Sequence, residues 1–217
     1  MNTVPKLLAE NITVLKNQRV VQLAGTPNGW QLSTETGDIF HTKKLLVTMP
    51  APQAVQLLEN SQIELTDSPL PNISYAPCLV VLAKLDQVSG IPAPGGIKTN
   101  GTVIEWMADN FQKGISKTPS LTIHANSDFS VQHLDGDLRA AGRLMLESAA
   151  ALIAPAKVTD WRVHRWRYSL CTQRHTDSYW QADTKWPLIF GGDGFGIGNV
   201  EGGFLSGRAM ADCLLEN

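Results

Sequence analysis

The sequence has few cysteines, and their arrangement excludes two kinds of site. Cys78, Cys171 and Cys213 are odd in number, far apart and outside any CxxC spacing. Such a pattern is typical of buried or unpaired thiols in a reducing compartment and suits neither a disulfide framework nor a zinc site. We therefore expect a cytoplasmic protein without a metal centre.

Long apolar runs and an excess of one charge are also missing. No stretch approaches the ~18 apolar residues of a membrane helix, and MNTVPKLLAENITV at the start is no signal peptide. The formal net charge of −2 gives no drive toward nucleic acid or an anionic membrane, so we expect neither as a partner. Charged residues make up 18% of the chain, below the ~25% of typical usage. That shortage indicates either surface covered by a cofactor or partner, or ordinary scatter in composition.

Familiar catalytic motifs are absent as well. The chain contains no HExxH, no GxSxG and no G-x-G-x-x-G register. Metalloprotease and α/β-hydrolase chemistry therefore have no support, and the usual dinucleotide fingerprint is missing.

Hydrophobic periodicity predicts an α+β fold. The first part reads as a helix over residues 3–10, a small strand at ITVL and an antiparallel meander of RVVQLAG, GWQLST and DIFHT. KLLVTMP then predicts a strand buried on both faces, followed by the helix PQAVQLLEN.

The middle of the chain predicts a second, antiparallel sheet from YAPCLVVLAKL, GTVIEWMADN and SLTIHANS. A helix from Asp137 to Ile153 stops at Pro155. Alternation in the strand KVTDWRVHRWRYSL gives it two different faces. One face carries Arg162, His164, Trp166 and Tyr168, and the other Trp161, Val163, Arg165 and Arg167.

The last segment, WPLIFGGDGFGIGNVEGGFLSGRAMADCLLEN, predicts a strand, a glycine-rich turn and a helix. Glycines in the turn let the backbone approach a ligand, and the helix N–H groups near Val200–Gly203 favour electron-rich oxygens. Gly203, Gly207 and Ala211 leave one side of the helix without bulk. The alternative is an αβ connection that binds nothing.

Three side chains are candidates for a substrate pocket. His124, in SLTIHANS, is a candidate proton donor or ligand contact, and Trp166 and Tyr168 are candidate walls for a planar substrate. The alternative is structural: a strand histidine bonded to a carbonyl, and aromatic rings packed on another layer.

Several of these segments together carry a family resemblance. The meander, LLVTMPAPQAVQLL, SLTIHANSDFS, VHRWRYS and FGGDGFGIGNVEGGFLSG follow one another in an order that resembles the renalase-like branch of the flavin-containing amine oxidase superfamily. The resemblance covers essentially the whole chain, and its most specific piece is GGDGF followed by NVEG.

The resemblance implies non-covalently bound FAD and names its contacts. The implied cofactor residues are Val20, Pro50, Asp193, Gly194, Asn199, Val200, Glu201 and Gly202. His124, Trp166 and Tyr168 would line the substrate side of the flavin, while no residue is implied as catalytic base. The implied reaction is hydride transfer from a reduced nicotinamide-like or amine substrate to flavin, with reoxidation by oxygen.

The family pattern begins with a βαβ unit that this sequence does not show, so we expect an incomplete FAD/NAD(P)-binding fold in an N-terminally truncated or split product. Residues 1–58 and 184–217 would be the remnant of the FAD-binding domain, and residues 59–183 the substrate domain. We do not expect tight FAD binding by the chain alone. A missing N-terminal half or a homodimer would cover the open sheet edge. The alternative function is a non-catalytic remnant that binds a partner or small ligand without FAD.

Overall fold

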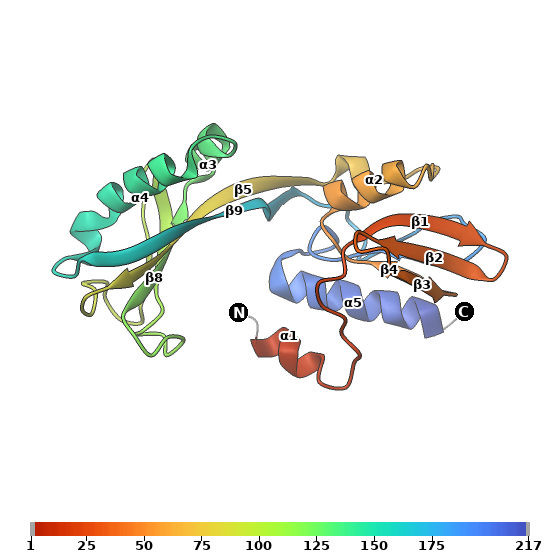
Figure 1. Ribbon diagram of the computed structural model, residues 1–217, viewed down its shortest axis with the longest axis horizontal. Coiled ribbons are helices and arrows are strands. Elements are labelled where there is room, and N and C mark those ends of the chain that lie inside the picture. The colour runs from red at the N-terminus through yellow and green to blue at the C-terminus, as the bar shows by residue number, and fades with distance from the viewer. Residues whose placement is uncertain (1–2, 216–217) are drawn as a thin grey trace. The chain divides into compact units, whose positions relative to one another are not determined.

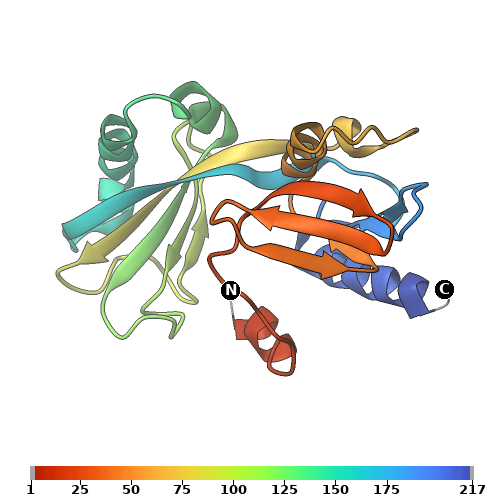
Figure 2. The same cartoon turned by 45° about the vertical axis from the view of Figure 1, so that its right-hand side comes forward.

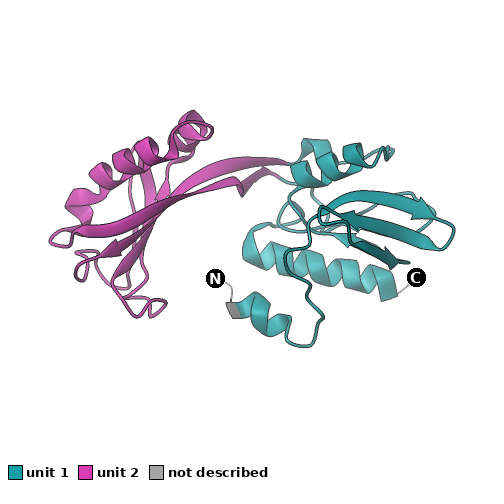
Figure 3. Cartoon of the chain, in the orientation of Figure 1, with its two compact units in different colours: residues 1–73, 174–217 teal, residues 74–173 magenta. Residues whose placement is uncertain are grey.

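The computed structural model describes residues 3–215 and divides the chain into two compact units (Figure 3). Unit 1 contains the described residues up to Ile73 and from Arg174 onward, and unit 2 is Ser74–Gln173. The predicted boundaries lay at residues 58/59 and 183/184. The observed boundaries differ from the predicted ones for two reasons. The short helix at Leu70–Asn72 packs on the helix before it, and the backbone just after Arg174 hydrogen-bonds to the C-terminal turn.

Unit 1 contains two small sheets and the helices around them (Figure 1). Its elements are α1 (Thr3–Leu8), β1 (Val20–Thr26), β2 (Gly29–Thr34), β3 (Ile39–Thr42), β4 (Leu45–Val47), α2 (Ala51–Asn60), η1 (Leu70–Asn72), β10 (Trp180–Gln181), β11 (Leu188–Phe190) and α5 (Asn199–Leu215).

The predicted meander is confirmed as the antiparallel sheet β1-β2-β3, which appears in red and orange in Figure 2. Its first turn depends on Gly29, whose φ is +144°. A Cβ at Gly29 would collide with the carbonyl of Thr42 on β3, so only glycine lets the three strands approach here.

Two strand predictions in unit 1 are wrong. ITVL forms no strand, and Ile12, Val14 and Leu15 are 65%, 57% and 59% exposed. These residues pair with no described strand, and a strand needs a hydrogen-bonding neighbour. KLLVTMP contributes only the three residues of β4, and Leu46 is 38% exposed rather than buried. Within residues 3–215, β4 is the edge of the sheet β10-β11-β4 and has a neighbour on one side only.

Unit 2 is a five-stranded antiparallel sheet with two helices on one face (Figure 1). The sheet order is β6-β7-β8-β5-β9. Its elements are β5 (Ser74–Leu85), β6 (Gly96–Lys98), β7 (Ile104–Asp109), β8 (Ser120–Ala125), α3 (Ser127–His133), α4 (Leu138–Ile153) and β9 (Val158–Gln173). The α+β class is thereby confirmed.

The core of unit 2 lies between the sheet and its helices. Alternate residues of β5 and β8, such as Val81 and Ile123, pack with Met145 of α4, and all three side chains are fully buried. α4 starts where Asp137 accepts hydrogen bonds from the backbone of Arg139 and Ala140, and it stops before Pro155, as predicted.

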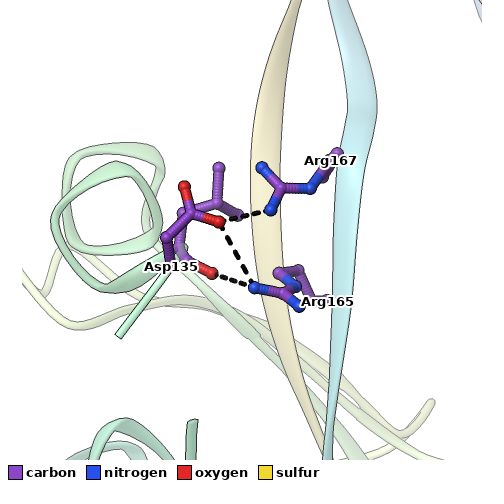
Figure 4. A network of polar contacts seen from close by, with 4 residues as sticks. Asp135, Arg165 and Arg167 are labelled. Carbon is purple, nitrogen blue, oxygen red and sulfur yellow. Dashed lines mark hydrogen bonds and ion pairs between the residues drawn. The ribbon is translucent and has the colours of Figure 1, made fainter. Parts of the chain in front are cut away.

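The two faces predicted for β9 are also found. Trp161 and Val163 pack against α4, where Gly142 leaves the room that their side chains need. Farther along the same face, Arg165 and Arg167 both reach Asp135, in the loop between α3 and α4 (Figure 4). Arg165 Nη1 also donates to the Leu134 carbonyl at 2.7 Å. The hydrogen bond from Arg167 lowers the pKa of Asp135 below its usual range.

The remaining sequence expectations concern cysteines and membranes. All three cysteines are buried and form no disulfide. Among the described helices, none has both the length and the apolar character needed to cross a bilayer.

One buried carboxylate fixes the turn after β7. Asp109 is 1% exposed and accepts hydrogen bonds from the Ser89 hydroxyl at 2.5 Å, from the Phe111 amide at 2.9 Å and from the Gln112 amide at 3.0 Å. Burial alone would raise the pKa of Asp109, but these bonds, with one from the Gln112 side chain, together hold it below its usual range.

We predict that Asp109→Asn lowers the free energy of unfolding of the protein by about 2 kcal/mol at pH 7, because four donors lose a charged acceptor. A depressed pKa stabilises the fold above the unfolded-state value and loses that effect as pH falls through the folded-state value. The difference between wild type and variant should therefore shrink below about pH 4. Denaturant unfolding followed by circular dichroism measures both.

The matched control is Asp160→Asn. Asp160 pairs with Lys84 at 3.2 Å on the surface, where both side chains are about two-thirds exposed (69% for Lys84 and 66% for Asp160). Such pairs contribute little, so this variant should unfold like wild type. Equal losses in the two variants would contradict the role given to Asp109.

Candidate functional site

The candidate cofactor region lies where two parallel strands end together. β4 and β11 pair in parallel, with Val47 opposite Phe190, so both carboxyl ends lie at one edge of the sheet. Beyond them, the Gly191 amide donates to the Val47 carbonyl at 3.1 Å, and a Cβ at Gly192 would lie 3.1 Å from the Thr48 carbonyl. The glycine turn (residues 191–198) thus runs directly beside the chain that leaves β4.

α5 holds the glycine turn from its other side. The Gly192 amide donates to the Ser206 hydroxyl at 2.8 Å, and Ser206 is 1% exposed. A Cβ at Gly191 would lie 2.5 Å from that hydroxyl and 2.6 Å from the Met210 sulfur. Gly192 itself has a φ of +121°, a conformation that suits glycine alone. Close approach to α5 therefore accounts for Gly191, and the backbone conformation accounts for Gly192.

The segment just after β9, at Arg174 and His175, contacts the rest of the turn and holds it by hydrogen bonds. The His175 amide donates to the Gly194 carbonyl at 2.9 Å, and the Gly196 amide donates to the His175 carbonyl at 2.9 Å. The Arg174 side chain packs against Gly198, immediately before α5 begins. A cation therefore lies beside a helix N-terminus. Nothing in the sequence pattern links Arg174 to the turn, so sequence reasoning missed it.

The first turn of α5 contains four of the predicted cofactor residues in two different environments. Asn199, Val200 and Glu201 are exposed. Gly202 is buried, and a Cβ there would lie 3.2 Å from the carbonyl carbon of Ile197. A side chain at position 202 would therefore need the chain at Ile197 to shift by a few tenths of an ångström.

The next glycines of α5 face open space. A Cβ at Gly203 would have only the Asp193 amide nitrogen near it, at 4.0 Å, and a Cβ at Gly207 would meet nothing within 4 Å. Among residues 3–215, little or nothing thus fills the space beside Gly203 and Gly207. A flat ligand lying against the glycine turn would find room there.

Val20 and Pro50 lie close to the same edge. Val20 lines two adjoining hollows of about 340 and 310 Å³, and both are also lined by Met49 and Leu57. Pro50 follows Met49 and starts α2. The chain at Thr48–Pro50 therefore brings Val20 and Pro50 near the glycine turn with Asp193 and Gly194. Thr48 and Met49 also belong to the candidate cofactor region, although the sequence analysis did not single them out.

The substrate-pocket candidates lie on unit 2, on the face of the sheet away from α4. His124 lies edge-to-face with Trp166 at a centroid distance of 5.5 Å, and Trp166 packs in the same way on His164 at 5.7 Å. Tyr168 contacts Tyr75 instead, at 5.9 Å.

A pocket of about 390 Å³ opens on this face, entirely within unit 2. Of the three predicted candidates only His124 lines it. Trp166 packs edge-to-face against His124 without lining the pocket, and Tyr168 does not line it either. Its walls also include residues that sequence reasoning missed, namely Cys78, Lys98, Glu105, Trp106, Ser127 and Ser169.

The inner groups of the pocket are held uncharged. Burial lowers the pKa of His124, and the nearby Glu105 carboxylate opposes this only in part. Burial raises the pKa of the Cys78 thiol to about 11. Its sulfur donates to the carbonyls of Leu79 at 3.5 Å and Ala125 at 3.7 Å. At neutral pH the pocket therefore presents a neutral imidazole and a neutral thiol.

Comparison with known proteins identifies what the chain is similar to. The family described as flavin containing amine oxidoreductase matches residues 1–215. The renalase of Mus musculus is 28% identical over 208 residues, covering 90% of this chain and 60% of the mouse protein. The chain thus spans less than two thirds of the length of this curated relative.

Solved structures share the fold at low sequence identity. Wild-type putrescine oxidase bound to putrescine is 12% identical with a TM-score of 0.65, covering 99% of this chain and 52% of the oxidase. An oxidoreductase from Methanosarcina mazei is 13% identical with a TM-score of 0.58, covering 90% of this chain and 49% of that protein.

We predict that His124 titrates below the usual range of histidine, because burial penalises its charged form. NMR of the imidazole Cε1–H signals against pH measures this directly. Glu105→Gln should lower the pKa of His124 further, since the carboxylate favours the imidazolium. Glu147→Gln, an exposed change on α4, is the control and should leave the titration unchanged. A His124 pKa near 6.5 or above would contradict the burial seen in the structure.

Proposed function

We propose that this chain, which belongs to the flavin containing amine oxidoreductase family, supplies the C-terminal portion of an FAD-dependent oxidoreductase of renalase or amine oxidase type. One observation carries the proposal. The ends of β4 and β11, the glycine turn and the start of α5 converge on a place where the helix face at Gly203 and Gly207 is open.

The residues at this place fit FAD. The 17-residue helix α5 presents its positive end to the turn, and Arg174 adds a cation there, which suits an electron-rich cofactor. The backbone at Asp193 and Gly194, with the α5 start at Asn199, Val200, Glu201 and Gly202, would hold the cofactor from this side. The hollows at Val20, beside Pro50, would accept its adenosine end.

The proposed reaction takes a hydride from a reduced nicotinamide-like or amine substrate. FAD, when bound, would accept the hydride from the substrate and would be reoxidised by oxygen. The protein orients the substrate, and the pocket of unit 2 with His124 is the place that we propose for it.

The mouse relative is longer than the part that this chain matches, and this difference matters for possible partners. Because the chain spans 60% of the mouse renalase, the activity of a whole family member is a proposal for this chain. The one-sided edge of β4 is where we propose that a further polypeptide or a second copy adds a strand.

A second candidate function is a binding protein without FAD. Val200 and Phe204 on α5 are 68% and 48% exposed, which is the kind of apolar surface that a partner covers. Flavin binding distinguishes this function from the first.

The test is FAD titration of the purified chain, followed by flavin fluorescence and by the absorbance that denaturation releases. We expect weak but saturable binding that Gly203→Leu reduces at least about tenfold, because the new side chain would fill the open space beside the Asp193 amide. Gly25→Leu is the matched control, because Gly25 is an exposed residue of β1 where a Cβ would also meet nothing within 4 Å. Gly203→Leu replaces glycine by a better helix former, so it should not unfold α5.

Two results would contradict the proposal. Colourless protein that ignores added FAD would favour the binding function. Equal affinity in wild type and Gly203→Leu would show that FAD, if bound, lies elsewhere. Gly202 is unsuitable for this test because its substitution would disturb the turn at Ile197.

A further inference from the structure

Three loops meet at one end of the unit 2 sheet. They are residues 86–95 between β5 and β6, residues 110–119 between β7 and β8, and residues 154–157 between α4 and β9. The strand register brings them to the same end, because Lys84 pairs with Ser120 and Leu85 pairs with Val158. We call these three loops the tip of unit 2.

Hydrogen bonds hold the loops of the tip to one another. The Asp86 carboxylate of the first loop accepts from the Lys157 amide of the third at 2.7 Å. The buried carboxylate of Asp109 joins the first two loops, since it accepts from the Ser89 hydroxyl and from the Phe111 amide. The tip is thus one preorganised surface, and a partner that binds it does not have to order the loops first.

Apolar side chains of the tip are exposed close to one another. Val88, Phe111 and Ile115 are 47%, 38% and 64% exposed. Val88 precedes Ser89, which shares its carboxylate partner with the Phe111 amide, so Val88 and Phe111 are neighbours. The Ile115 amide donates to the Asn110 carbonyl at 2.9 Å, which brings Ile115 beside Phe111. The three side chains therefore form a group and are not scattered singly over the surface.

Positive charge accompanies these apolar side chains. The three loops contain Lys113, Lys117 and Lys157, all exposed, and Asp86 as their only acidic residue. Their net charge is therefore +2, whereas that of the whole chain is −2. The sequence analysis expected no anionic membrane as a partner because the whole-chain charge averages over the surface and does not reveal this local excess.

The shape of the tip distinguishes between possible partners. Gly114 has a φ of +67°, and a Cβ there would meet nothing within 4 Å, so the second loop turns in open space between Lys113 and Ile115. A projecting turn fits a fluid surface that yields around it. Apolar side chains that enter the headgroup layer, beside lysines that face anionic headgroups, are the combination that binds proteins to a bilayer surface.

We propose that the tip of unit 2 binds the surface of an anionic lipid bilayer. Val88, Phe111 and Ile115 enter the headgroup layer, and the three lysines lie against lipid phosphates. The attachment is peripheral and uses loops alone. It goes beyond the proposed function and needs neither FAD nor the pocket of unit 2.

Sedimentation of the full-length chain with lipid vesicles tests the proposal. One vesicle preparation is phosphatidylcholine alone, and the other contains about 30% phosphatidylglycerol. We expect binding to the anionic vesicles to be at least about tenfold tighter in about 0.1 M NaCl. That preference should largely disappear in about 0.5 M NaCl, because salt screens exposed charges.

The first pair of variants tests the charges. Lys113→Gln combined with Lys117→Gln should weaken binding to anionic vesicles at least about tenfold, since each lysine near such a surface contributes about fivefold. The matched control is Lys43→Gln combined with Arg208→Gln, which removes two exposed cations from unit 1. Its affinity should stay within about twofold of wild type.

The second pair of variants tests the apolar contact. Ile115→Ser should weaken binding to anionic vesicles at least about fivefold, because less apolar area enters the headgroup layer. Ile115 is 64% exposed, so the change should leave the fold intact. Val131→Ser on α3 is the matched control, since Val131 is 61% exposed but lies outside the tip. It should bind like wild type.

Several results would overturn the proposal. Equal binding to neutral and anionic vesicles would do so, as would equal effects of Ile115→Ser and Val131→Ser. Binding that survives both tip variants would place the contact at other exposed apolar side chains, such as those of residues 4–15. Binding to soluble poly-glutamate that is as tight as binding to anionic vesicles would indicate an acidic protein partner instead. None of these results depends on whether the chain binds FAD.

Discussion

Parallel pairing of β4 with β11 is the interaction on which the candidate cofactor region depends. Antiparallel pairing would place the ends of the two strands at opposite edges, whereas parallel pairing brings both carboxyl ends to one edge. That edge is where ligands bind in open α/β sheets. Here it brings Thr48 and Pro50 beside the glycine turn, although they are far apart in the sequence. The pairing covers only three residues on each strand, so the bonds of Gly191 to Val47 and of Gly192 to Ser206 help to keep the turn in place.

In unit 2 the two faces of one sheet have different surroundings. Its sheet is two-sided, and strand alternation sends Trp161, Val163, Arg165 and Arg167 of β9 toward the helices. The core and the Asp135 pair occupy that face (Figure 4). The opposite face is left for His124, Trp106 and Trp166. The same sheet thus carries the core on one side and the pocket on the other.

Sequence periodicity predicted much of this fold because it reports burial on one face. The meander, the helix after Asp137 and the two faces of β9 all follow from spacing and caps. Prediction failed where burial depends on a neighbour. ITVL and KLLVTMP are apolar enough for inner strands, yet Ile12 is exposed with no described strand beside it, and Leu46 is exposed on β4, which has a described neighbour on one side only.

The candidate sites were predictable to a smaller extent, for a related reason. The glycine turn is visible in the sequence, but Arg174 joins it through tertiary folding. In the same way, Trp106 and Lys98 join His124 only through strand register, which one sequence does not reveal. Trp166 and Tyr168 share a face of β9, but only Trp166 contacts His124. Alternation along a strand predicts the face on which a residue lies, but it does not predict which residue of the next strand lies opposite.

The two adjacent glycines of NVEGG have different surroundings, so each has to be interpreted separately. Gly202 is buried and packs tightly against Ile197, whether or not a ligand binds. Gly203 has nothing but the Asp193 amide near it, so the fold has no use for its missing side chain. A helix-interior glycine costs about 1 kcal/mol relative to alanine, and packing offsets that cost only at Gly202. At Gly203 no contact within the described chain offsets the cost, which is why the proposed FAD test rests on this glycine and not on its neighbour.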